Sequence, residues 1–589
     1  MLAVLMVSAL CAGCGGLHQA ASGTSSRKTA TPPTAAKTAT TATTSPKATP
    51  ASTTTTPSSS LSSLVIESRP EARLTDNFNP FLTSSPLGAM GVPSYIYEPL
   101  MQYNELQIDQ YYPWLATSWS FSTSGLTITF NLRAGVKWDD GSQFNASDVA
   151  YTFNLLKTNP SFDPGIPLVS AQAVAPLTFV LTLSRPGYAY LYDIARVPIV
   201  KAGYAAGGRL ASFTDAAPDG TGPYELAARG DCTPRQVVLA ARKDYWQGSP
   251  PFQKLVFPAY PTSAAVSAAL SDGTLDWAAI DLAGGAAGYL AKGEDHDHFW
   301  APAVSSVVLE LNLADPGFDN LSVRRAISDA IDRTQISQLV DGGAGQAVRT
   351  LSGLVLPIDQ EFLEPSDSSD VTLQGEPGAV PVLMRQAGYH TDAQGYWCSA
   401  SGVPLGVDIQ NAAGSPFATA AGTIAEELAA AGFDASSSAP PTARWHQDLV
   451  DGAFEASIVN GSSGPSPFYM YENWLDPALV VGGRALTGDY ERFGPATMPA
   501  AAAQVTADLG SFTTSLSDSP NAVHAIKALA SVVATQLPVI PLVYSAAWGE
   551  FSTLRATGWP DGQDPYEPAT PRAPFAEYTV LQLSATTAS

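Results

Sequence analysis

Basic residues are scarce in this chain. Its 589 residues hold 30 Lys and Arg against 53 Asp and Glu, which gives a formal net charge of −23. Because the phosphates of nucleic acids repel so acidic a surface, the composition excludes nucleic acid as a partner. The sequence also has no apolar run of the roughly 20 residues that a membrane-crossing helix needs. We therefore expect a turn-rich globular protein, with 47 Pro and 48 Gly to supply the turns.

Familiar catalytic motifs are missing as well. The chain has no Gly-x-Ser-x-Gly elbow, no His-Glu-x-x-His helix and no phosphate-binding glycine loop. One local cluster of metal-ligand types occurs at residues 295–298, but on an extended segment only His296 and His298 would share a face, so we expect a solvated loop. We predict no catalytic residue, no cofactor and no metal. A glycoside hydrolase stays open as an alternative, because folding could pair two of the many carboxylates.

The N-terminal segment has the pattern of an exported protein. Residues 1–14 form a short apolar stretch that ends in LCAGC, which is similar to a bacterial lipobox and makes Cys14 the candidate lipidated residue. Residues 15–63 consist almost entirely of Thr, Ala, Ser and Pro, a composition that predicts a disordered tether. We expect a protein held by a lipid anchor at the extracellular face of the cell membrane. A secretory signal without lipid is the alternative.

Four cysteines are few for a chain of this length. Two lie in the N-terminal segment, and the other two are Cys232 and Cys398. In an oxidising exported setting two such thiols favour a disulfide over a metal site, so this pair is a candidate disulfide.

The rest of the chain mixes strand and helix patterns, which indicates an α/β or mixed α+β fold. Residues 126–133 alternate apolar and polar side chains, as a half-buried strand does, and the following Asp140-Gly141 pair favours a tight turn. Asn145 and Asp148 have the spacing of a helix N-cap and an acidic third residue, which predicts a helix from there.

Three later helices are predicted by apolar periodicity. Residues 323–333 place their charges, Arg324 among them, mostly on the face opposite the apolar one. Residues 424–431 form a second helix that stops at Gly432. A third helix, at residues 523–537, leads into a buried strand at 539–544.

Several motifs together resemble the family 5 extracellular solute-binding proteins, which include dipeptide, oligopeptide, nickel and some oligosaccharide receptors of ABC importers. The most specific match is PWLATSW at residues 113–119, followed by FNLRAGVKWDDG at 130–141 and FNASDV at 144–149. Further matches in the expected order include YEPL at 97–100, GTGPY at 220–224, DYW at 244–246 and LPVIPL at 537–542. The resemblance covers nearly everything from Val65 to Leu583.

The resemblance implies a two-lobed clamp of the periplasmic-binding-protein type (type II, cluster C) that closes over its solute. We assign residues 64–100, 200–308 and 538–589 to lobe I, residues 101–199 to an inserted subdomain of it, and residues 309–537 to lobe II. The implied role is the substrate-binding component of an ABC importer, a monomer that delivers its solute to permease subunits and performs no catalysis. A lipoprotein sensor of solute would use the same clamp and remains an alternative.

The solute is an oligopeptide by family resemblance, with an oligosaccharide, similar to those of cello-oligosaccharide receptors, as the alternative. Peptide receptors of this family hold the peptide's amino terminus with an aspartate after a strand, and the corresponding residues here, 456–471, contain no acid. Aromatic and amide side chains suit sugars. The candidate ligand-binding residues are Asn460, Ser462, Phe468, Tyr469, Tyr471, Trp474, Tyr544, Trp548 and Trp559. Such aromatic residues are more often packing residues, and we expect Arg133 and Asp276 to be structural charges.

Overall fold

The computed structural model describes residues 63–586, except 71, 208, 281–285, 294, 341–344, 366–372, 462–463, 486, 548 and 573–575. The predicted signal peptide and nearly all of the tether lie outside the described residues, and so do three predicted site residues, Cys14, Ser462 and Trp548. None of the described helices is both long and apolar enough to cross a bilayer.

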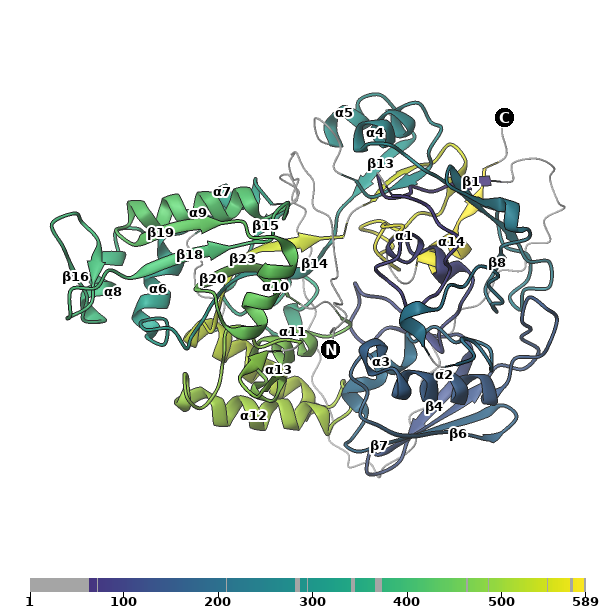
Figure 1. Cartoon of the computed structure of the whole chain (residues 1–589), viewed down its shortest axis with the longest axis horizontal. Helices are drawn as coiled ribbons and strands as arrows, with labels where there is room; N and C mark the ends of the chain where they lie inside the picture. The colour runs from purple at the N-terminus through teal and green to yellow at the C-terminus, as the bar shows by residue number, and fades with distance from the viewer. Residues whose placement is uncertain are drawn as a thin grey trace, which may run out of the picture.

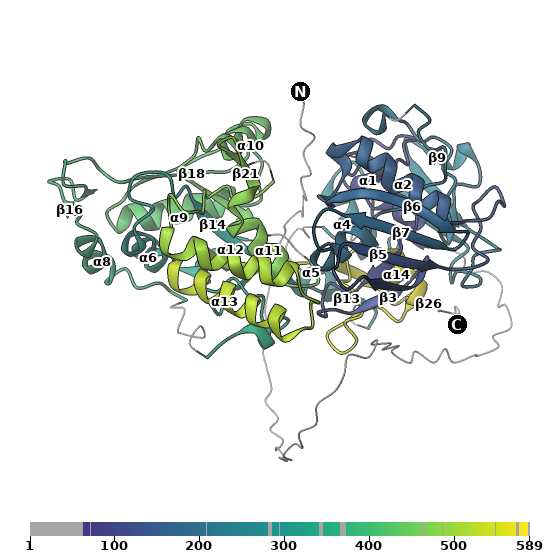
Figure 2. The same ribbon diagram turned by 90° about the horizontal axis from the view of Figure 1, so that it is seen from below.

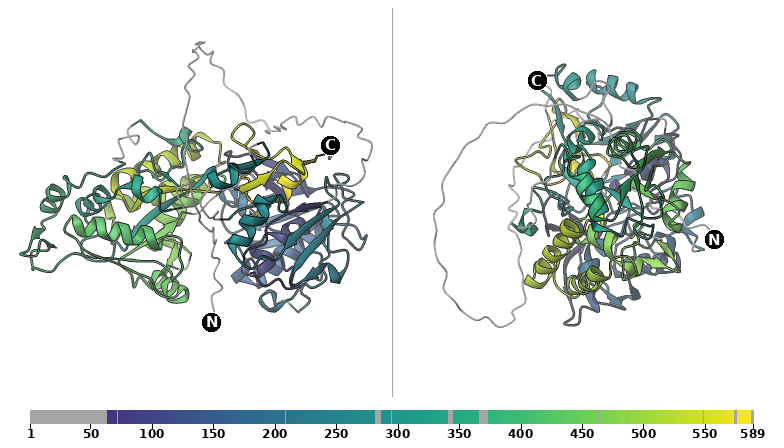
Figure 3. Two further views of the ribbon diagram at one scale, coloured as in Figure 1. Left: turned by 90° about the horizontal axis from the view of Figure 1, so that it is seen from above. Right: turned by 90° about the vertical axis from the view of Figure 1, so that its left-hand side faces the viewer.

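The chain folds into two lobes that lie side by side (Figures 1 and 3). The first lobe contains a five-stranded sheet in which β1 and β11 pair in parallel and the other pairs are antiparallel. Its strands are β1 (Ser63–Val65), β8 (Tyr224–Glu225), β9 (Cys232–Thr233), β10 (Gln236–Ala241) and β11 (Lys254–Pro258). A three-stranded sheet joins β24 (Gly549–Ser552) to β12 (Trp277–Ala278) and β13 (Asp297–Trp300). The first lobe therefore combines segments from the start, the middle and the end of the chain.

A separate four-stranded sheet in the first lobe is covered by helix α2 (Ala146–Thr158). Its order is β4 (Ala116–Phe121), β5 (Thr127–Leu132), β7 (Thr178–Leu183) and β6 (Leu168–Ala175). The predicted strand and capped helix are confirmed. The Asn145 side chain accepts a hydrogen bond from the Ser147 N–H at 2.8 Å, and the Asp148 carboxylate accepts one from the Asn145 N–H at 3.0 Å. The turn before them has Gly141 at φ +84°, where glycine is favoured.

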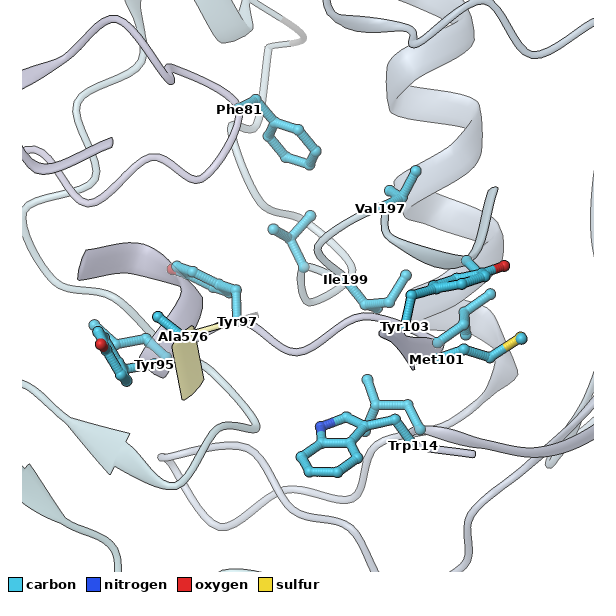
Figure 4. Close-up of a cluster of buried hydrophobic side chains, with 14 of the residues drawn as sticks. Phe81, Tyr95, Tyr97, Met101, Tyr103, Trp114, Val197, Ile199 and Ala576 are labelled. Carbon is cyan, nitrogen blue, oxygen red and sulfur yellow. The ribbon is translucent and has the colours of Figure 1, made fainter. Parts of the chain in front are cut away.

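One large hydrophobic core extends through most of the first lobe, and Figure 4 shows part of it. It packs Tyr95 and Tyr97 of the first segment with Met101, Tyr103 and Trp114, and helix α14 (Ala576–Gln582) adds side chains from near the C-terminus. Residues 101–199, which we predicted as an inserted subdomain, thus have a sheet of their own but share the core of the lobe.

The second lobe is built on a six-stranded sheet with helices on both faces (Figures 1 and 2). The strand order is β15 (Gln346–Ala347), β23 (Val539–Ala546), β14 (Ala303–Leu311), β20 (Ala456–Asn460), β18 (Gly406–Gln410) and β19 (Asp434–Ser438). Neighbouring side chains of β14 point to opposite faces of the sheet, and a layer of helices covers each face. Val307 and Leu309 pack with α6 (Leu321–Ala330) and α9 (Ala418–Ala430), whereas Val308 packs with α11 (Phe468–Leu475), α12 (Pro499–Thr513) and α13 (Pro520–Gln536).

The predicted helix at 323–333 is corrected in two respects. It breaks into α6 and α7 (Arg333–Ser337), with Asp332 as the N-cap of the second helix. Arg324, which we placed on the solvent side, is only 1% exposed, and its guanidinium donates hydrogen bonds to the carbonyl oxygens of Phe318 and Leu537 at 2.7 and 2.9 Å. Amphipathic periodicity does not foresee such a buried cation, because the accepting carbonyls come from other segments.

The other two predicted helices and the buried strand are confirmed. Helix α9 ends before Gly432, which has φ +93°. Helix α13 leads into β23, every residue of which is buried.

The chain crosses between the lobes twice, between β13 and β14 and between β23 and β24. The two crossings touch, since the Ala547 N–H donates to the Pro302 carbonyl oxygen at 2.9 Å. Our predicted lobe boundaries at 308/309 and 537/538 are therefore corrected. Strands β14 and β23 belong entirely to the sheet of the second lobe, because they pair with each other along most of their length.

The predicted disulfide is wrong, since Cys232 and Cys398 are both free thiols. Cys232 begins β9 in the first lobe, and Cys398 ends β17 (Trp397–Cys398), the partner strand of β16 (His390–Thr391). Figure 2 shows β9 and β16 at opposite ends of the molecule. The number of cysteines carries no information on how far apart they lie in the fold. The separation of β9 and β16 rules out a bond between these two cysteines.

Candidate functional site: a cavity between the lobes

A small cavity lies where the two lobes meet. Glu105, from the loop between β2 (Met101–Tyr103) and β3 (Tyr111–Pro113), lines it from the first lobe. The second lobe contributes residues of β14, of the loop at 355–359 and of the loop before α11. The volume is about 20 Å³, which holds a group of about the size of one water molecule. A larger solute would require the lobes to separate at this cavity.

Two acidic residues line this cavity, Glu105 from the first lobe and Asp359 from the second. The Tyr192 hydroxyl donates to Glu105 Oε1 at 3.1 Å, and the Val355 N–H donates to Asp359 Oδ2 at 2.7 Å. Burial raises the pKa of Glu105, against the lowering effects of the Tyr192 hydrogen bond and the positive charge of Arg196. Burial also raises the pKa of Asp359, to about 7. No Lys or Arg lines the cavity in the described part of the chain.

A third acid, Glu567, interacts with Glu105 but does not line the cavity. Glu567 is 1% exposed, and neither of its carboxyl oxygens has a hydrogen-bond partner among the described residues. Burial raises its pKa, and the charge of Glu105 raises it further. The neighbouring cation, Arg196, already pairs with Asp193 at 2.9 Å.

The lobes also contact each other directly beside the cavity. The Tyr469 hydroxyl of α11 donates to the Ala189 carbonyl oxygen of the first lobe at 2.8 Å, and the Tyr469 and Tyr192 ring centroids lie 5.4 Å apart. Ala189 is 4% exposed and packs in the hydrophobic cluster formed around α11–α13. Tyr469, which we predicted to stack on solute, therefore bridges the two lobes in this conformation.

Five other predicted stacking residues are core residues. Their exposed fractions are 1% for Phe468, 0% for Tyr471, 0% for Trp474, 1% for Tyr544 and 7% for Trp559. The Phe468 ring stacks on Phe512 with centroids 4.1 Å apart, and Trp559 stacks on Phe551 in the core of the first lobe at 5.0 Å. None of these five lines the cavity. Aromatic spacing in the sequence does not distinguish a core ring from a ring that faces a cleft.

Asn460 keeps its candidate role. It ends β20 and is half-buried, and its side-chain oxygen is buried without a hydrogen-bond partner among the described residues. The next residue, Gly461, accepts a hydrogen bond from the hydroxyl of Ser305, which lines the cavity, at 2.7 Å. Asn460 itself does not line the cavity.

The acids at the cavity were missed from the sequence. Residues 456–471, which correspond to the segment where peptide receptors of this family carry their aspartate, contain no acid. Glu105 and Asp359 lie in irregular segments far from that stretch and far from each other. The one local signal in the sequence was weak: Glu105 follows the YEPL motif at 97–100 closely.

The histidines at 296 and 298 and the two charges that we predicted to be structural lie outside the cavity lining. The His298 ring stacks on Phe551 at 5.4 Å, and no group of three or more His, Cys, Asp or Glu in the described residues could hold a metal ion. Asp276 is fully buried and pairs with Arg555 at 2.5 Å. The Arg133 guanidinium lies over the Trp246 ring, 4.0 Å from its centroid. Both charges hold the first lobe together, away from the cavity lining.

A second, larger hollow of about 310 Å³ lies within the second lobe alone. It is lined by polar residues of β18 and of the loop before β20, among them Asp408, Gln410 and Glu455. The Asp408 carboxylate is already occupied by the hydroxyls of Ser436 and Ser438 at 2.8 and 2.7 Å. Since every described residue that lines this hollow belongs to the second lobe, a movement of the lobes would not change its lining.

Comparisons with known proteins agree with this architecture. Residues 110–479 match the family described as bacterial extracellular solute-binding proteins, family 5 Middle. A nickel-binding periplasmic protein from Escherichia coli K12 is 27% identical over 337 residues, which is 54% of this chain and 61% of that protein. A dipeptide-binding protein of the same strain is 27% identical over 341 residues, 53% of this chain and 61% of that protein. The matches thus span about three fifths of the length of these two curated relatives.

Solved structures show the same fold. A periplasmic oligopeptide-binding protein of an ABC transporter from Thermotoga maritima has a TM-score of 0.77 at 20% identity and covers 89% of this chain and 99% of its own. A second structure of a periplasmic oligopeptide-binding protein from Thermotoga maritima, with mannohexaose bound, has a TM-score of 0.70 at 20% identity. It covers 90% of this chain and 99% of its own. The predicted two-lobed mixed α/β fold is confirmed. Because the family match extends over more than half of its residues, this chain belongs to the bacterial extracellular solute-binding proteins, family 5.

Proposed function

We propose that this protein is the substrate-binding component of an ABC importer, which captures an extracellular oligopeptide between its lobes and delivers it to permease subunits. The observation that carries the proposal is a cavity lined by residues of both lobes. Two crossings of the chain connect these lobes in the part that the structure describes. A solute that contacts both lobes stabilises the closed form by its differential affinity, and a permease can recognise that form. The protein acts as a monomer that binds its solute and releases it unchanged, so it is not an enzyme.

An oligopeptide is the first candidate solute. Curated relatives include dipeptide-binding and glutathione-binding proteins. The carboxyl groups of Glu105 and Asp359 at the cavity favour a solute with a positive charge over a neutral one.

An oligosaccharide is the second candidate. It is favoured by the mannohexaose-bound structural neighbour and by the unpartnered side-chain oxygen of Asn460, which suits a sugar hydroxyl.

A melting experiment separates the two solute classes. Ligand that binds only the folded state raises the melting temperature, so we expect a rise with short peptides, for example alanine oligomers of two to five residues. The same plate should contain β-linked glucan and mannan oligomers of matched length. A rise with the sugars and none with any peptide would replace the oligopeptide by the oligosaccharide. No rise with either class, in a folded protein, would count against the transport role.

We further propose that a lipid on Cys14 holds the protein at the extracellular face of the membrane. The support is the lipobox-like sequence, followed by a Thr, Ala, Ser and Pro-rich stretch that leads to the described lobes. Replacing Cys14 by Ala is expected to move the protein from the membrane fraction to the medium, measured by immunoblot of both fractions. Cys11→Ala is the matched control, and it should leave the protein in the membrane fraction. An unchanged distribution of the Cys14→Ala protein would refute the anchor.

A sensor that reports solute to a signalling partner would use the same clamp. Permease and ATPase genes beside the gene for this chain would support import, whereas a receptor kinase gene there would support sensing.

A further inference from the structure

Helix α11 presents two faces with different surroundings. Tyr471 and Trp474 are fully buried and pack in the core of the second lobe. Tyr469 and Glu472 lie on the opposite side of the helix, where residues three positions apart are neighbours. Figure 1 shows α11 on the side of the second lobe that faces α3 (Leu191–Ala195) of the first. The face of α11 that the core leaves free therefore lies towards the first lobe.

The contact between this face and the first lobe is made by protein atoms of both lobes. The Tyr469 hydroxyl donates to the Ala189 carbonyl oxygen at 2.8 Å, and the Tyr469 ring centroid lies 5.4 Å from that of Tyr192. Ala189 belongs to the short helix η3 (Tyr188–Tyr190) of the first lobe, yet its side chain packs in the hydrophobic cluster of the second. A hydrogen bond and apolar packing thus join the lobes here, whichever solute the protein binds.

Charged groups of both lobes surround Glu472. Burial raises the pKa of Glu472 to about 7, and repulsion by Asp476 of its own lobe and by Asp193 of α3 adds to the rise. The positive charge of Arg185, in the first lobe, opposes it. The Arg185 guanidinium lies over the Tyr190 ring of η3, 4.8 Å from its centroid. The protonation of Glu472 is therefore linked to the position of the first lobe.

The direction of the pKa shift gives the pH dependence of this contact. Separation of the lobes would move Asp193 away from Glu472 and admit water, so the pKa of Glu472 would fall towards its ordinary value of 4.5. A carboxyl group with a higher pKa in the joined form stabilises that form fully below the ordinary value, and this contribution is lost as the pH rises through the raised value. Asp109 of the first lobe acts in the same direction, because burial and the charge of Asp518 raise its pKa.

We infer that Tyr469 and Glu472 form a latch on α11 that holds the two lobes together at acidic pH, even without solute, and releases them as the pH rises. This inference goes beyond the proposed function. Tyr192 connects the latch to the cavity, since its hydroxyl donates to Glu105 Oε1 at 3.1 Å. If the protein binds solute as proposed, a solute larger than the cavity has to wait for the latch to open. Its apparent affinity is then reduced in proportion to the fraction of open molecules.

Small-angle X-ray scattering of the full-length protein without solute measures the separation of the lobes through the radius of gyration. We expect a larger radius at pH 8 than at pH 6, which corresponds to a fall of about 10-fold in the ratio of joined to separated molecules. Glu472→Gln removes the titrating group and should abolish most of this pH difference. Tyr469→Phe removes only the hydroxyl, so it should lower the ratio about 2- to 10-fold at both pH values and keep the pH difference.

Two substitutions of the same types at exposed positions serve as controls. Glu426→Gln in α9 and Tyr396→Phe, at a residue that is 38% exposed, should both scatter as the unmodified protein does. Circular dichroism at both pH values verifies that each variant is folded.

The latch is overturned if the unmodified protein has the same radius of gyration at pH 6 and pH 8. A pH difference that persists unchanged in Glu472→Gln would also overturn it, and so would a Tyr469→Phe protein with the radius of the unmodified protein at both pH values. The transport role stands in each case, because these measurements contain no solute. Conversely, a failure of every peptide and sugar to raise the melting temperature counts against the transport role and leaves the latch intact.

Discussion

Replacing Gly549 by Ala is expected to destabilise the first lobe by about 3 kcal/mol or more, since overpacking in a fixed backbone costs roughly 1–3 kcal/mol and occasionally more. Gly549 begins β24, directly after the second crossing between the lobes. A Cβ atom there would stand 1.6 Å from the carbonyl oxygen of Ala569 and 2.6 Å from its carbonyl carbon. The two backbone segments would have to separate, and that movement would also disturb the 2.7 Å hydrogen bond from Trp277 Nε1 to the same oxygen.

Urea unfolding followed by tryptophan fluorescence measures this effect. Gly230→Ala is the matched control, because Gly230 is exposed and a Cβ atom there meets nothing within 4 Å. The control should unfold at the midpoint of the unmodified protein, and Gly549→Ala should unfold at a clearly lower urea concentration. Equal midpoints for all three proteins would contradict the close approach of residues 549 and 569.

The second large effect concerns pH. Glu310, Asp489 and Glu491 form a buried acid cluster in the second lobe, with exposed fractions of 1%, 1% and 0%. Carboxyl oxygens of all three lack hydrogen-bond partners among the described residues. Burial raises the pKa of each above its ordinary value, and the mutual repulsion of the three acids adds to this for Asp489 and Glu491. The positive charge of Arg492 opposes the rise in all three, and the negative charge of Asp476 adds to it at Asp489.

The direction of the pKa shifts gives the pH dependence. Since these pKa values are higher in the folded than in the unfolded protein, the folded state binds more protons above the ordinary carboxyl values of 3.8 and 4.5. The contribution of the cluster to stability is therefore complete below those values and is lost as the pH rises through the raised ones. We expect the free energy of unfolding in urea to fall between pH 5 and pH 9.

The Glu491→Gln variant tests this origin of the pH dependence. It removes one buried charge, so it should match the unmodified protein at pH 5 and exceed its stability at pH 9 by about 1–3 kcal/mol, the cost of an unsatisfied buried polar group. Glu426→Gln, at an exposed position, should keep the original pH dependence. If Glu491→Gln and the unmodified protein lose stability in parallel, the cluster is not the cause.

The sequence shows a motif with two glycines, but only the structure shows the physical reason for them. The GTGPY motif at 220–224 identified the family from the sequence. The structure explains it, because a Cβ atom on Gly220 or Gly222 would lie 2.0 Å from the carbonyl oxygen of Ile96 or 2.4 Å from that of Tyr95. These close approaches bring the motif against the segment that carries YEPL. The sequence alone does not show that the two motifs are in contact.

The burial of the candidate binding residues could not be predicted from the sequence. Aromatic side chains around α11 were predicted to face solute, yet Phe468 and Trp474 are buried and Tyr469 holds the lobes together. The acids that line the cavity came instead from two irregular segments, at Glu105 and Asp359. A loop carries no periodicity from which the direction of its side chains could be predicted.

The sequence by itself determined the elements whose causes are local. Alternation gave the strand β5, the Asn145 and Asp148 side chains started α2, and Gly432 stopped α9. Family membership followed from ordered motifs. Only the tertiary structure decided which charges are buried, where the chain crosses between lobes, that Cys232 and Cys398 lie apart, and which acids line the cavity. The physical reason is that burial, pairing and electrostatic environment depend on atoms that are distant along the chain and adjacent only after folding.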